Sequence, residues 1–183
     1  MTGPSEAQTI RDSIVPALDR DGWPAHRIER EFAITGRKRE VVGGRVRRGT
    51  QLAADLVLMH ASGHPICAVE AKRSLRSEHD GVQQAKDYGT RLALPIVYAT
   101  NGRTIIEVDL YAGTQREVAH YRSAEELWAY YRSTKDLNSL GVHFFEVPYS
   151  RDLIDAGSGQ IKQMRYYQHE AAQAVLRAIA TPS

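Results

Sequence analysis

Hydrophobic and polar residues follow helical spacing near the start of the chain and strand spacing after it. Ser5, a typical N-cap residue, precedes apolar residues that recur every three or four positions up to Leu18, which predicts a helix. Pro16 is expected to kink or interrupt that helix, because proline lacks a backbone N–H. Residues 28–34 then alternate between a mostly apolar face and a more polar one, which predicts a strand.

The middle of the chain has the pattern of a buried sheet. Residues 51–60 and 65–72 are nearly continuous apolar runs, typical of central strands that are covered on both faces. Further along we expect, in order, a helix over 78–93, strands over 95–100 and 104–109 around the turn Asn101-Gly102, and a helix over 124–131. This order predicts an α/β fold, with a mixed central β-sheet flanked by helices.

The pattern divides the chain into three parts. Residues 1–135 are expected to form the folded domain, residues 136–164 an irregular linker, and residues 165–183 a last helix. The linker prediction rests on the small and polar stretch Asp155-Ala-Gly-Ser-Gly.

Composition narrows the class of protein. The 183 residues are 42% hydrophobic and 25% charged, which excludes a wholly disordered chain. The apolar runs, such as 92–99, are much shorter than the roughly 20 residues of a membrane span, and the N-terminus lacks the pattern of a secretory signal. The single cysteine, Cys67, excludes a disulfide scaffold and a cysteine-based zinc site, so we expect a cytoplasmic protein without a membrane anchor.

Positive charge is concentrated in one segment. The net charge is only +2, yet residues 27–48 hold eight Arg or Lys against three Glu. Residues 36–50, which contain Arg45, Arg47 and Arg48, are rich in glycine and predict a basic loop. Such a loop fits either an anionic partner, nucleic acid first, or a merely solvated surface.

Two carboxylates and an ammonium group fall on neighbouring strands. Glu70 and Lys72 are two positions apart, so they share one sheet face. A hairpin centred on Ser62-Gly63 pairs Asp55 with Glu70, which puts all three side chains together. A turn with an odd number of residues would shift this register and separate them.

Two carboxylates so close together repel each other, and a divalent cation relieves that repulsion. Asp55, Glu70 and the backbone carbonyl of Ala71 are hard oxygen ligands that suit Mg²⁺. Lys72 would then stabilise negative charge that develops on a reacting phosphate. The alternative is a buried network of lysine and carboxylates with no chemistry.

Asp55 followed by Glu70-Ala71-Lys72 resembles the signature of PD-(D/E)xK nucleases, with Ala54-Asp55 in place of Pro-Asp. Gln84 and Tyr88 resemble the Q-x-x-x-Y motif of the RecB-like branch, and a spacing of four puts both on one helix face. The resemblance implies a restriction-endonuclease-like fold, with Asp55, Glu70 and Lys72 catalytic, and with Gln84 and Tyr88 beside the metal and touching DNA. Taken alone, the spacing of these two residues favours the alternative, a core tyrosine with Gln84 as its hydrogen-bond partner.

Longer segments of the sequence resemble one family more specifically. Five segments resemble the N-terminal nuclease domain of type I restriction enzyme R (HsdR) subunits: Ala53-Ala-Asp-Leu-Val-Leu, Ala68-Val-Glu-Ala-Lys-Arg, Gln83-Gln-Ala-Lys-Asp-Tyr, Tyr98-Ala-Thr-Asn-Gly-Arg and Glu125-Glu-Leu-Trp. The resemblance implies Mg²⁺-dependent hydrolysis of DNA, in a complex with methyltransferase and specificity subunits.

The resemblance also predicts roles for residues outside the central motif, at both ends of the chain. Glu6 leads the apolar stripe of the first helix, so we expect it to face inward and to reach the metal, as a glutamate of the first helix often does in this superfamily; the alternative is that it only complements the helix dipole. Residues 165–183 resemble the segment that leads into the helicase domain, where Gln168 would contact adenine. No phosphate loop follows this segment, so we expect ATP to bind only to a full-length subunit. We also expect this chain to be a fragment or a truncated product.

Two other functions remain open at this point. The same fold also serves an inactive DNA-binding or subunit-docking module, or a stand-alone repair or junction nuclease. A metal titration separates the active nuclease from the inactive module.

Overall fold

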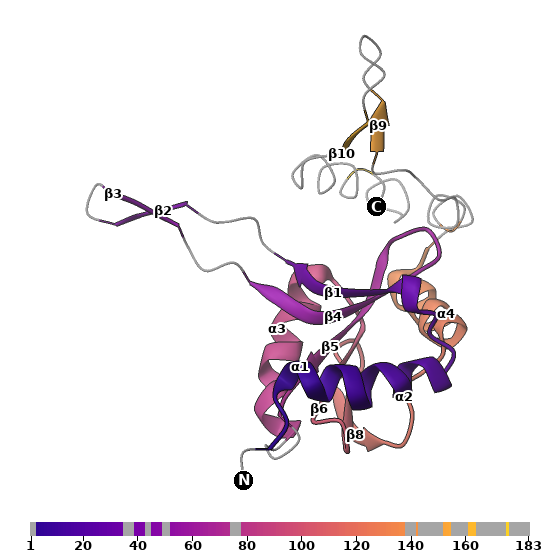
Figure 1. The fold of residues 1–183 in the computed structure, drawn as a ribbon. Helices are drawn as coiled ribbons and strands as arrows, with labels where there is room; N and C mark the ends of the chain where they lie inside the picture. Colours follow the sequence, from indigo (N-terminus) through magenta and orange to yellow (C-terminus); the bar gives the residue numbers. More distant parts are fainter. Residues whose placement is uncertain are drawn as a thin grey trace.

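A mixed sheet of six strands, in the order β1-β4-β5-β6-β7-β8, forms the centre of the computed structural model (Figure 1). The structure describes residues 3–34, 39–42, 45–48, 52–73, 78–137, 142, 152–154, 161–163 and 175. The β5–β6 pair is parallel and the other neighbours are antiparallel, which confirms the predicted α/β class. The strands of this sheet are β1 (Ile28–Ala33), β4 (Ala53–Met59), β5 (Pro65–Ala71), β6 (Ile96–Thr100), β7 (Ile105–Asp109) and β8 (Thr114–Val118).

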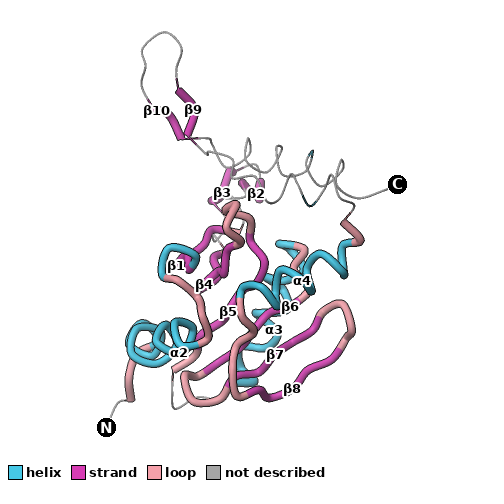
Figure 2. The backbone as a smooth tube through the Cα atoms, turned by 90° about the vertical axis from the view of Figure 1, so that its right-hand side faces the viewer, coloured by secondary structure: helices cyan, strands magenta, loops and turns pink. Residues whose placement is uncertain are grey.

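Helices cover both faces of the sheet (Figures 1 and 2). The N-terminal helical segment and α4 pack on one face, against buried residues such as Leu56 and Tyr98. Helix α3 packs on the other, where Tyr88 meets Ala68 and Val97. The helical elements are α1 (Glu6–Thr9), η1 (Ile10–Ile14), α2 (Val15–Arg20), η2 (Ala25–Arg27), η3 (Glu78–Gly81), α3 (Val82–Leu92) and α4 (Ala124–Lys135). Among the described residues, no helix combines the length and apolar character needed to cross a membrane.

The first helix begins as predicted and contains a wider turn before its proline. The Ser5 hydroxyl accepts from the backbone N–H of Gln8, whose side chain accepts from the Ser5 backbone, so a capping box closes the N-terminus. Pro16 cannot donate a backbone hydrogen bond, and the segment before it, η1, is a π-helix in which Val15 N–H bonds the Ile10 carbonyl. The expected interruption at Pro16 is therefore a local widening of a continuous helical segment.

The register of the β4–β5 hairpin brings the predicted site together, although its turn is odd-numbered. Near the turn, His60 N–H bonds the carbonyl of His64, which leaves Ala61, Ser62 and Gly63 in the turn. The predicted turn, centred between Ser62 and Gly63, is therefore wrong, because the observed turn is centred on Ser62. A β-bulge between Leu58 and Met59 compensates, so that further along Leu56 pairs with Val69 in the predicted register.

Several elements differ from the sequence prediction. The predicted basic loop, residues 36–50, contains an antiparallel strand pair, β2 (Arg39–Val42) and β3 (Arg45–Arg48). The edge strand β8 went unpredicted because its side chains are mostly exposed and polar. Helix α4 continues beyond Tyr131 to Lys135.

The C-terminal part of the chain contains one further strand pair. It is formed by β9 (Asp152–Ile154) and β10 (Ile161–Gln163), in a region predicted to be irregular. Of the predicted helix 165–183 the structure describes only Val175, which is helical; Gln168 lies outside the described residues.

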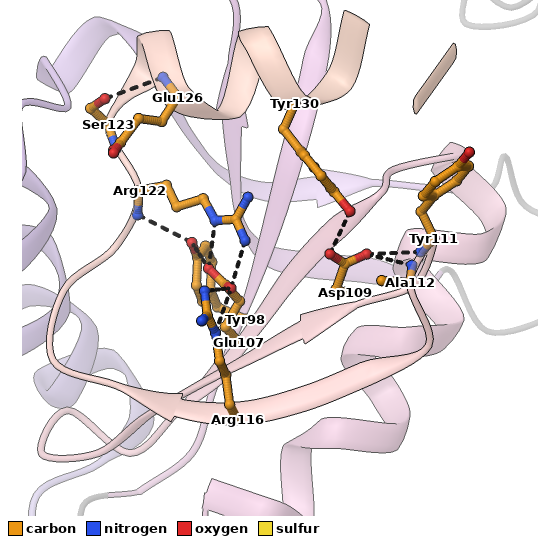
Figure 3. A network of polar contacts seen from close by, with 10 residues as sticks. All are labelled: Tyr98, Glu107, Asp109, Tyr111, Ala112, Arg116, Arg122, Ser123, Glu126 and Tyr130. Carbon is orange, nitrogen blue, oxygen red and sulfur yellow. Dashed lines mark hydrogen bonds and ion pairs between the residues drawn. The ribbon is translucent and has the colours of Figure 1, made fainter. Parts of the chain in front are cut away.

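A buried ionic network ties the far edge of the sheet to the loop before α4 (Figure 3). Glu107 is 2% exposed, and its carboxylate accepts hydrogen bonds from Tyr98, Arg116 and Arg122 at 2.8–3.2 Å. Burial raises the pKa of Glu107, but these donors outweigh it and hold the pKa below its usual value. This carboxylate is fully satisfied and stabilises the fold.

Candidate functional site

Asp55, Glu70 and Lys72 meet on the face of the sheet that α3 covers. Their neighbours Val57 and Ala68, in the same alternation, belong to the core under α3. An Asp55 carboxylate oxygen accepts the backbone N–H of Ala71 at 2.8 Å, which fixes the side chain at the end of β5. The structure thus brings together the three residues that the register argument predicted.

Glu70 is the most deeply buried member of this group, with 1% of its surface exposed. Its Oε1 accepts from Lys72 Nζ at 2.6 Å, whereas its Oε2 is buried and receives no hydrogen bond from the described part of the chain. Burial, followed by the negative charge of Asp55, raises the pKa of Glu70 to about 7. The fold therefore holds a carboxylate that lacks sufficient partners.

The neighbours of Glu70 are only partly shielded from water. Burial raises the pKa of the half-buried Asp55, although the Ala71 N–H opposes that shift. Burial lowers the pKa of Lys72, but the hydrogen bond and charge of Glu70 outweigh it and the net shift is upward. Lys72 thus stays an ammonium ion, and the two carboxylates share its one positive charge.

A chain of hydrogen bonds joins Lys72 to α3. Lys72 Nζ donates to Gln84 Oε1 at 3.1 Å, and Gln84 Nε2 donates to the hydroxyl of Tyr88. Tyr88 is 1% exposed, whereas Gln84 lies at the surface. Gln84 and Tyr88 therefore stand beside the carboxylates, as the motif predicted, and Gln84 is the member open to a ligand.

Gly81 and Thr100 complete the site and were not predicted. A Cβ on Gly81 would lie 3.1 Å from Cγ of Glu70 and 3.4 Å from Cγ of Lys72, so the missing side chain lets α3 approach the site closely. The backbone N–H of Lys72 bonds the carbonyl of Thr100 at 2.8 Å, which anchors Lys72 where β5 ends. A glycine inside the predicted helix 78–93 was the available signal for Gly81.

The remaining predicted residues lie further out. Glu6 is exposed in the first turn of α1, so the inward orientation expected of it is wrong: the apolar stripe of this helix turns toward the core only from Ile10 onward. Its charge still acts on the pKa values of Asp55 and Lys72, which places it near them. Arg45, Arg47 and Arg48 lie on β3, and their side chains are outside the described part of the structure.

The oxygen atoms at the site fit a divalent cation. Within the described residues, no group of three or more His, Cys, Asp or Glu side chains is arranged to hold a metal. Two carboxylates are present, however, and a buried Glu70 oxygen without a partner in the described part of the chain is the atom that a cation would satisfy. The predicted ligands Asp55, Glu70 and the Ala71 carbonyl are therefore compatible with Mg²⁺.

Comparisons with known proteins agree with this geometry. No family model matches the chain. The endonuclease subunit of the type I restriction enzyme EcoAI from Escherichia coli is 32% identical over 96% of this chain. A fragment assigned to the HsdR subunit of a type I restriction enzyme from Vibrio vulnificus YJ016 superimposes with a TM-score of 0.77 and 27% identity over 98% of this chain.

The chain is a homologue of the HsdR subunits of type I restriction enzymes. It spans 22% of the length of the Escherichia coli relative and 33% of the Vibrio fragment. The predicted resemblance to HsdR subunits and the predicted α/β fold are both confirmed by these matches.

Proposed function

We propose that this HsdR homologue is a Mg²⁺-dependent DNA endonuclease domain that hydrolyses phosphodiester bonds. The observation that supports the proposal most directly is Glu70, a buried carboxylate with one oxygen unpartnered among the described residues, held beside Asp55 and Lys72. A structural ion pair is expected to satisfy all its buried oxygens, as the Glu107 network does. The contrast between the two carboxylates favours a binding site over a packing device.

Asp55, Glu70 and the carbonyl of Ala71 would hold the cation, and Glu6 is close enough to contribute to its field. A bound Mg²⁺ supplies Lewis-acid polarisation of the phosphate. Lys72 stays protonated and presents its ammonium group where negative charge develops on that phosphate. Gln84 keeps Lys72 in place, and Tyr88 keeps Gln84 in place.

The basic strand pair is close enough along the chain to the candidate site to contact the same DNA. Arg48 and Asp55 are seven residues apart, so their Cα atoms lie within roughly 25 Å of each other. We propose that Arg45, Arg47 and Arg48 contact phosphates beyond the reaction site.

The decisive experiment is nicking of supercoiled plasmid by the purified chain with Mg²⁺ or Mn²⁺. We expect slow nicking at unrelated sequences, its loss in Glu70→Gln and in Lys72→Ala, and no change in Glu117→Gln, which alters an exposed carboxylate on β8. Nicking that survives in Glu70→Gln contradicts the proposal. Cuts clustered at one sequence would instead indicate a self-sufficient restriction endonuclease.

The names of the relatives suggest the wider setting. We propose that the domain works in the cytoplasm within a restriction complex that includes methyltransferase and specificity subunits, and that ATP serves only a full-length subunit. Calorimetric titration with Mg²⁺ separates an active nuclease from an inactive docking module. Heat released by the wild type but not by an Asp55→Ala, Glu70→Gln double variant supports the active site.

A further inference from the structure

The strands β2 and β3 form a two-stranded antiparallel ribbon that is separate from the six-stranded sheet (Figure 1). In the chain this ribbon follows β1 and precedes β4, which are themselves neighbours in the large sheet. The pairing of those neighbours reaches the bond from the Ile34 N–H to the Leu52 carbonyl at 2.9 Å, and Asp55 lies only three residues further along the chain. The ribbon is therefore joined to the sheet at the end where the candidate site lies.

Positive charge dominates the sequence of the ribbon. Its two strands contain four arginines, one glutamate and three valines, which gives a net charge of +3. A basic element that is joined to the sheet beside a candidate nuclease site suits a polyanion as its ligand.

The pairing register divides these residues between two faces. Partners across an antiparallel pair share a face, and so do residues two positions apart along a strand. The pairs of the first face, which we call the acid-free face, are Arg39 with Arg48 and Val41 with Val46. The pairs of the second face are Glu40 with Arg47 and Val42 with Arg45. Both faces hold two arginines, but only the second holds a carboxylate.

The width of the ribbon matches one groove of a DNA duplex. Its strands lie roughly 4.8 Å apart before side chains are added, which is too wide for a minor groove of about 6 Å. The major groove is about 12 Å wide and admits a two-stranded ribbon. Guanidinium groups bind guanine edges and phosphate oxygens there, and valine is suited to contact the methyl group of thymine. A glutamate turned toward DNA would repel the phosphates, so the acid-free face is the one that suits the groove.

We infer that the ribbon enters the major groove of the DNA substrate with its acid-free face toward the base edges. The inference rests on the proposed DNA substrate and adds to it the groove, the face and a role for Arg39. Arg45 and Arg47, on the second face, contact phosphates at the rims of the groove. Arg48 and Asp55 lie within roughly 25 Å of each other and base pairs rise by about 3.4 Å, so the contacted groove lies within about seven base pairs of the reacting phosphate.

The test compares two duplexes by affinity rather than by cleavage. Binding of the purified chain to a fluorescent 20-base-pair duplex that contains an A·T tract is measured in EDTA. The second duplex has the same sequence, with glucosylated 5-hydroxymethylcytosine in place of cytosine, so that sugars fill the major groove. We expect the wild type to bind the glucosylated duplex at least about tenfold more weakly, which corresponds to the loss of one good base contact. Netropsin, which occupies the minor groove of the A·T tract, should leave binding unchanged.

Two double variants that lose the same charge test the face. Arg39→Gln with Arg48→Gln should bind the two duplexes equally, because the arginines of the acid-free face are gone. Arg45→Gln with Arg47→Gln should bind both duplexes more weakly and keep the tenfold preference. Each double variant loses two positive charges, so the general attraction to DNA falls alike in both. Since the ribbon is separate from the six-stranded sheet, both variants should keep the melting temperature of the wild type.

Equal binding of the two duplexes by the wild type overturns the inference, and that comparison needs no variant. Competition by netropsin would place the ribbon in the minor groove, and loss of the preference only in Arg45→Gln with Arg47→Gln would mean that the wrong face was chosen; each result contradicts the inference. Plasmid nicking is measured in parallel. A groove preference without nicking contradicts only the nuclease, and nicking without a groove preference contradicts only the role of the ribbon.

Discussion

Glu70 and Glu107 are two buried carboxylates of one sheet whose pKa values are shifted in opposite directions. Glu70 lies under α3 with one oxygen unpartnered within the described part of the chain, and Glu107 lies on the other face with hydrogen-bond donors at both oxygens (Figure 3). Burial is similar at the two positions, so the partners decide the difference. Glu107 is fully hydrogen-bonded and stabilises the fold, whereas Glu70 keeps an oxygen that is available to bind a cation.

The two carboxylates should therefore respond differently to the same substitution. Glu107→Gln leaves the guanidinium of Arg122 without its ionic partner, and we expect it to lower the free energy of unfolding by about 3 kcal/mol. Arg116 is mostly exposed and adds little to that loss. Glu70→Gln removes a carboxylate that burial and Asp55 already destabilise, so the free energy of unfolding should stay within about 1 kcal/mol.

Urea denaturation at pH 8 in EDTA measures both changes, and plasmid nicking is assayed in parallel. Glu70→Gln should reduce nicking by more than the roughly 10–100-fold that loss of an outer partner of a metal ligand costs. Equal destabilisation by the two substitutions would show that Glu70 is a structural ion-pair partner like Glu107.

The pKa of Glu70 also predicts how stability depends on pH in metal-free protein. Its folded pKa of about 7 lies above the usual value of 4.5, so the folded state binds more protons than the unfolded state between these values. Its contribution to stability is complete below about pH 4.5 and is lost as pH rises through 7. The loss should amount to roughly 1–3 kcal/mol.

The measurement is the free energy of unfolding in EDTA at several pH values from 5 to 8.5. Glu70→Gln should remove the decline above pH 5, whereas Glu117→Gln, at an exposed site on β8, should retain it. Mg²⁺ favours the ionised carboxylate, so it should stabilise the wild type more at pH 8 than at pH 5.5. A decline that persists unchanged in Glu70→Gln assigns it to another group.

The site could be predicted from the sequence because its spacing depends on strand alternation. Glu70 and Lys72 must share a face, and the register that brings Asp55 to them holds beyond Leu58. The odd-numbered turn, in which Gly63 takes a left-handed conformation, and the β-bulge between Leu58 and Met59 were not predictable from hydrophobic alternation. The extra turn residue and the β-bulge each shift the register by one residue in opposite senses, so the predicted register holds at Asp55 and Glu70.

Hydrophobic periodicity did not predict several other features of the structure. The strands β2 and β3 have glycine on either side and many charges, which is the composition of a loop. Glu6 is exposed because it lies in the first turn of α1, ahead of Ile10, where the helix first packs on the core, and helical spacing alone does not show where that packing begins. Gly81 could have been noticed, but only the fold shows that it faces Glu70.

The hydrogen-bond chain from Lys72 predicts that Tyr88 acts through Gln84. Tyr88→Phe removes the acceptor of Gln84 Nε2 and should reduce nicking about tenfold, with a loss of about 1 kcal/mol in stability. Gln84→Ala releases Lys72 directly and should cost more. The double variant should be no worse than Gln84→Ala alone, because both changes break one chain. Additive losses would indicate that Gln84 and Tyr88 contact DNA independently.

The strand pair β2–β3 should contribute to DNA affinity without contributing to the reaction itself. Replacing Arg45, Arg47 and Arg48 by Gln should make the plot of log K against log salt less steep by about 0.9 for each phosphate that is no longer neutralised. Nicking at saturating DNA should stay close to the wild-type rate. An unchanged slope would mean that these arginines are only solvated.

Gly81 offers the sharpest test of how closely α3 must approach the site. Its φ of −92° suits any residue, so Gly81→Ala strains no backbone and only places a methyl group 3.1 Å from Cγ of Glu70 and 3.4 Å from Cγ of Lys72. Glu70 is enclosed and must shift by a few tenths of an ångström, so we expect stability to change by less than about 1 kcal/mol and nicking to fall by about tenfold.

Gly63→Ala is the opposite control: it has open space but a φ of +78°, so it should lower stability by about 1 kcal/mol and leave the nicking rate of the folded protein intact. Thermal melting and plasmid nicking on both variants separate a positional effect at the site from general destabilisation, and a Gly81→Ala protein with full activity would show that the contact between α3 and Glu70 has room to spare.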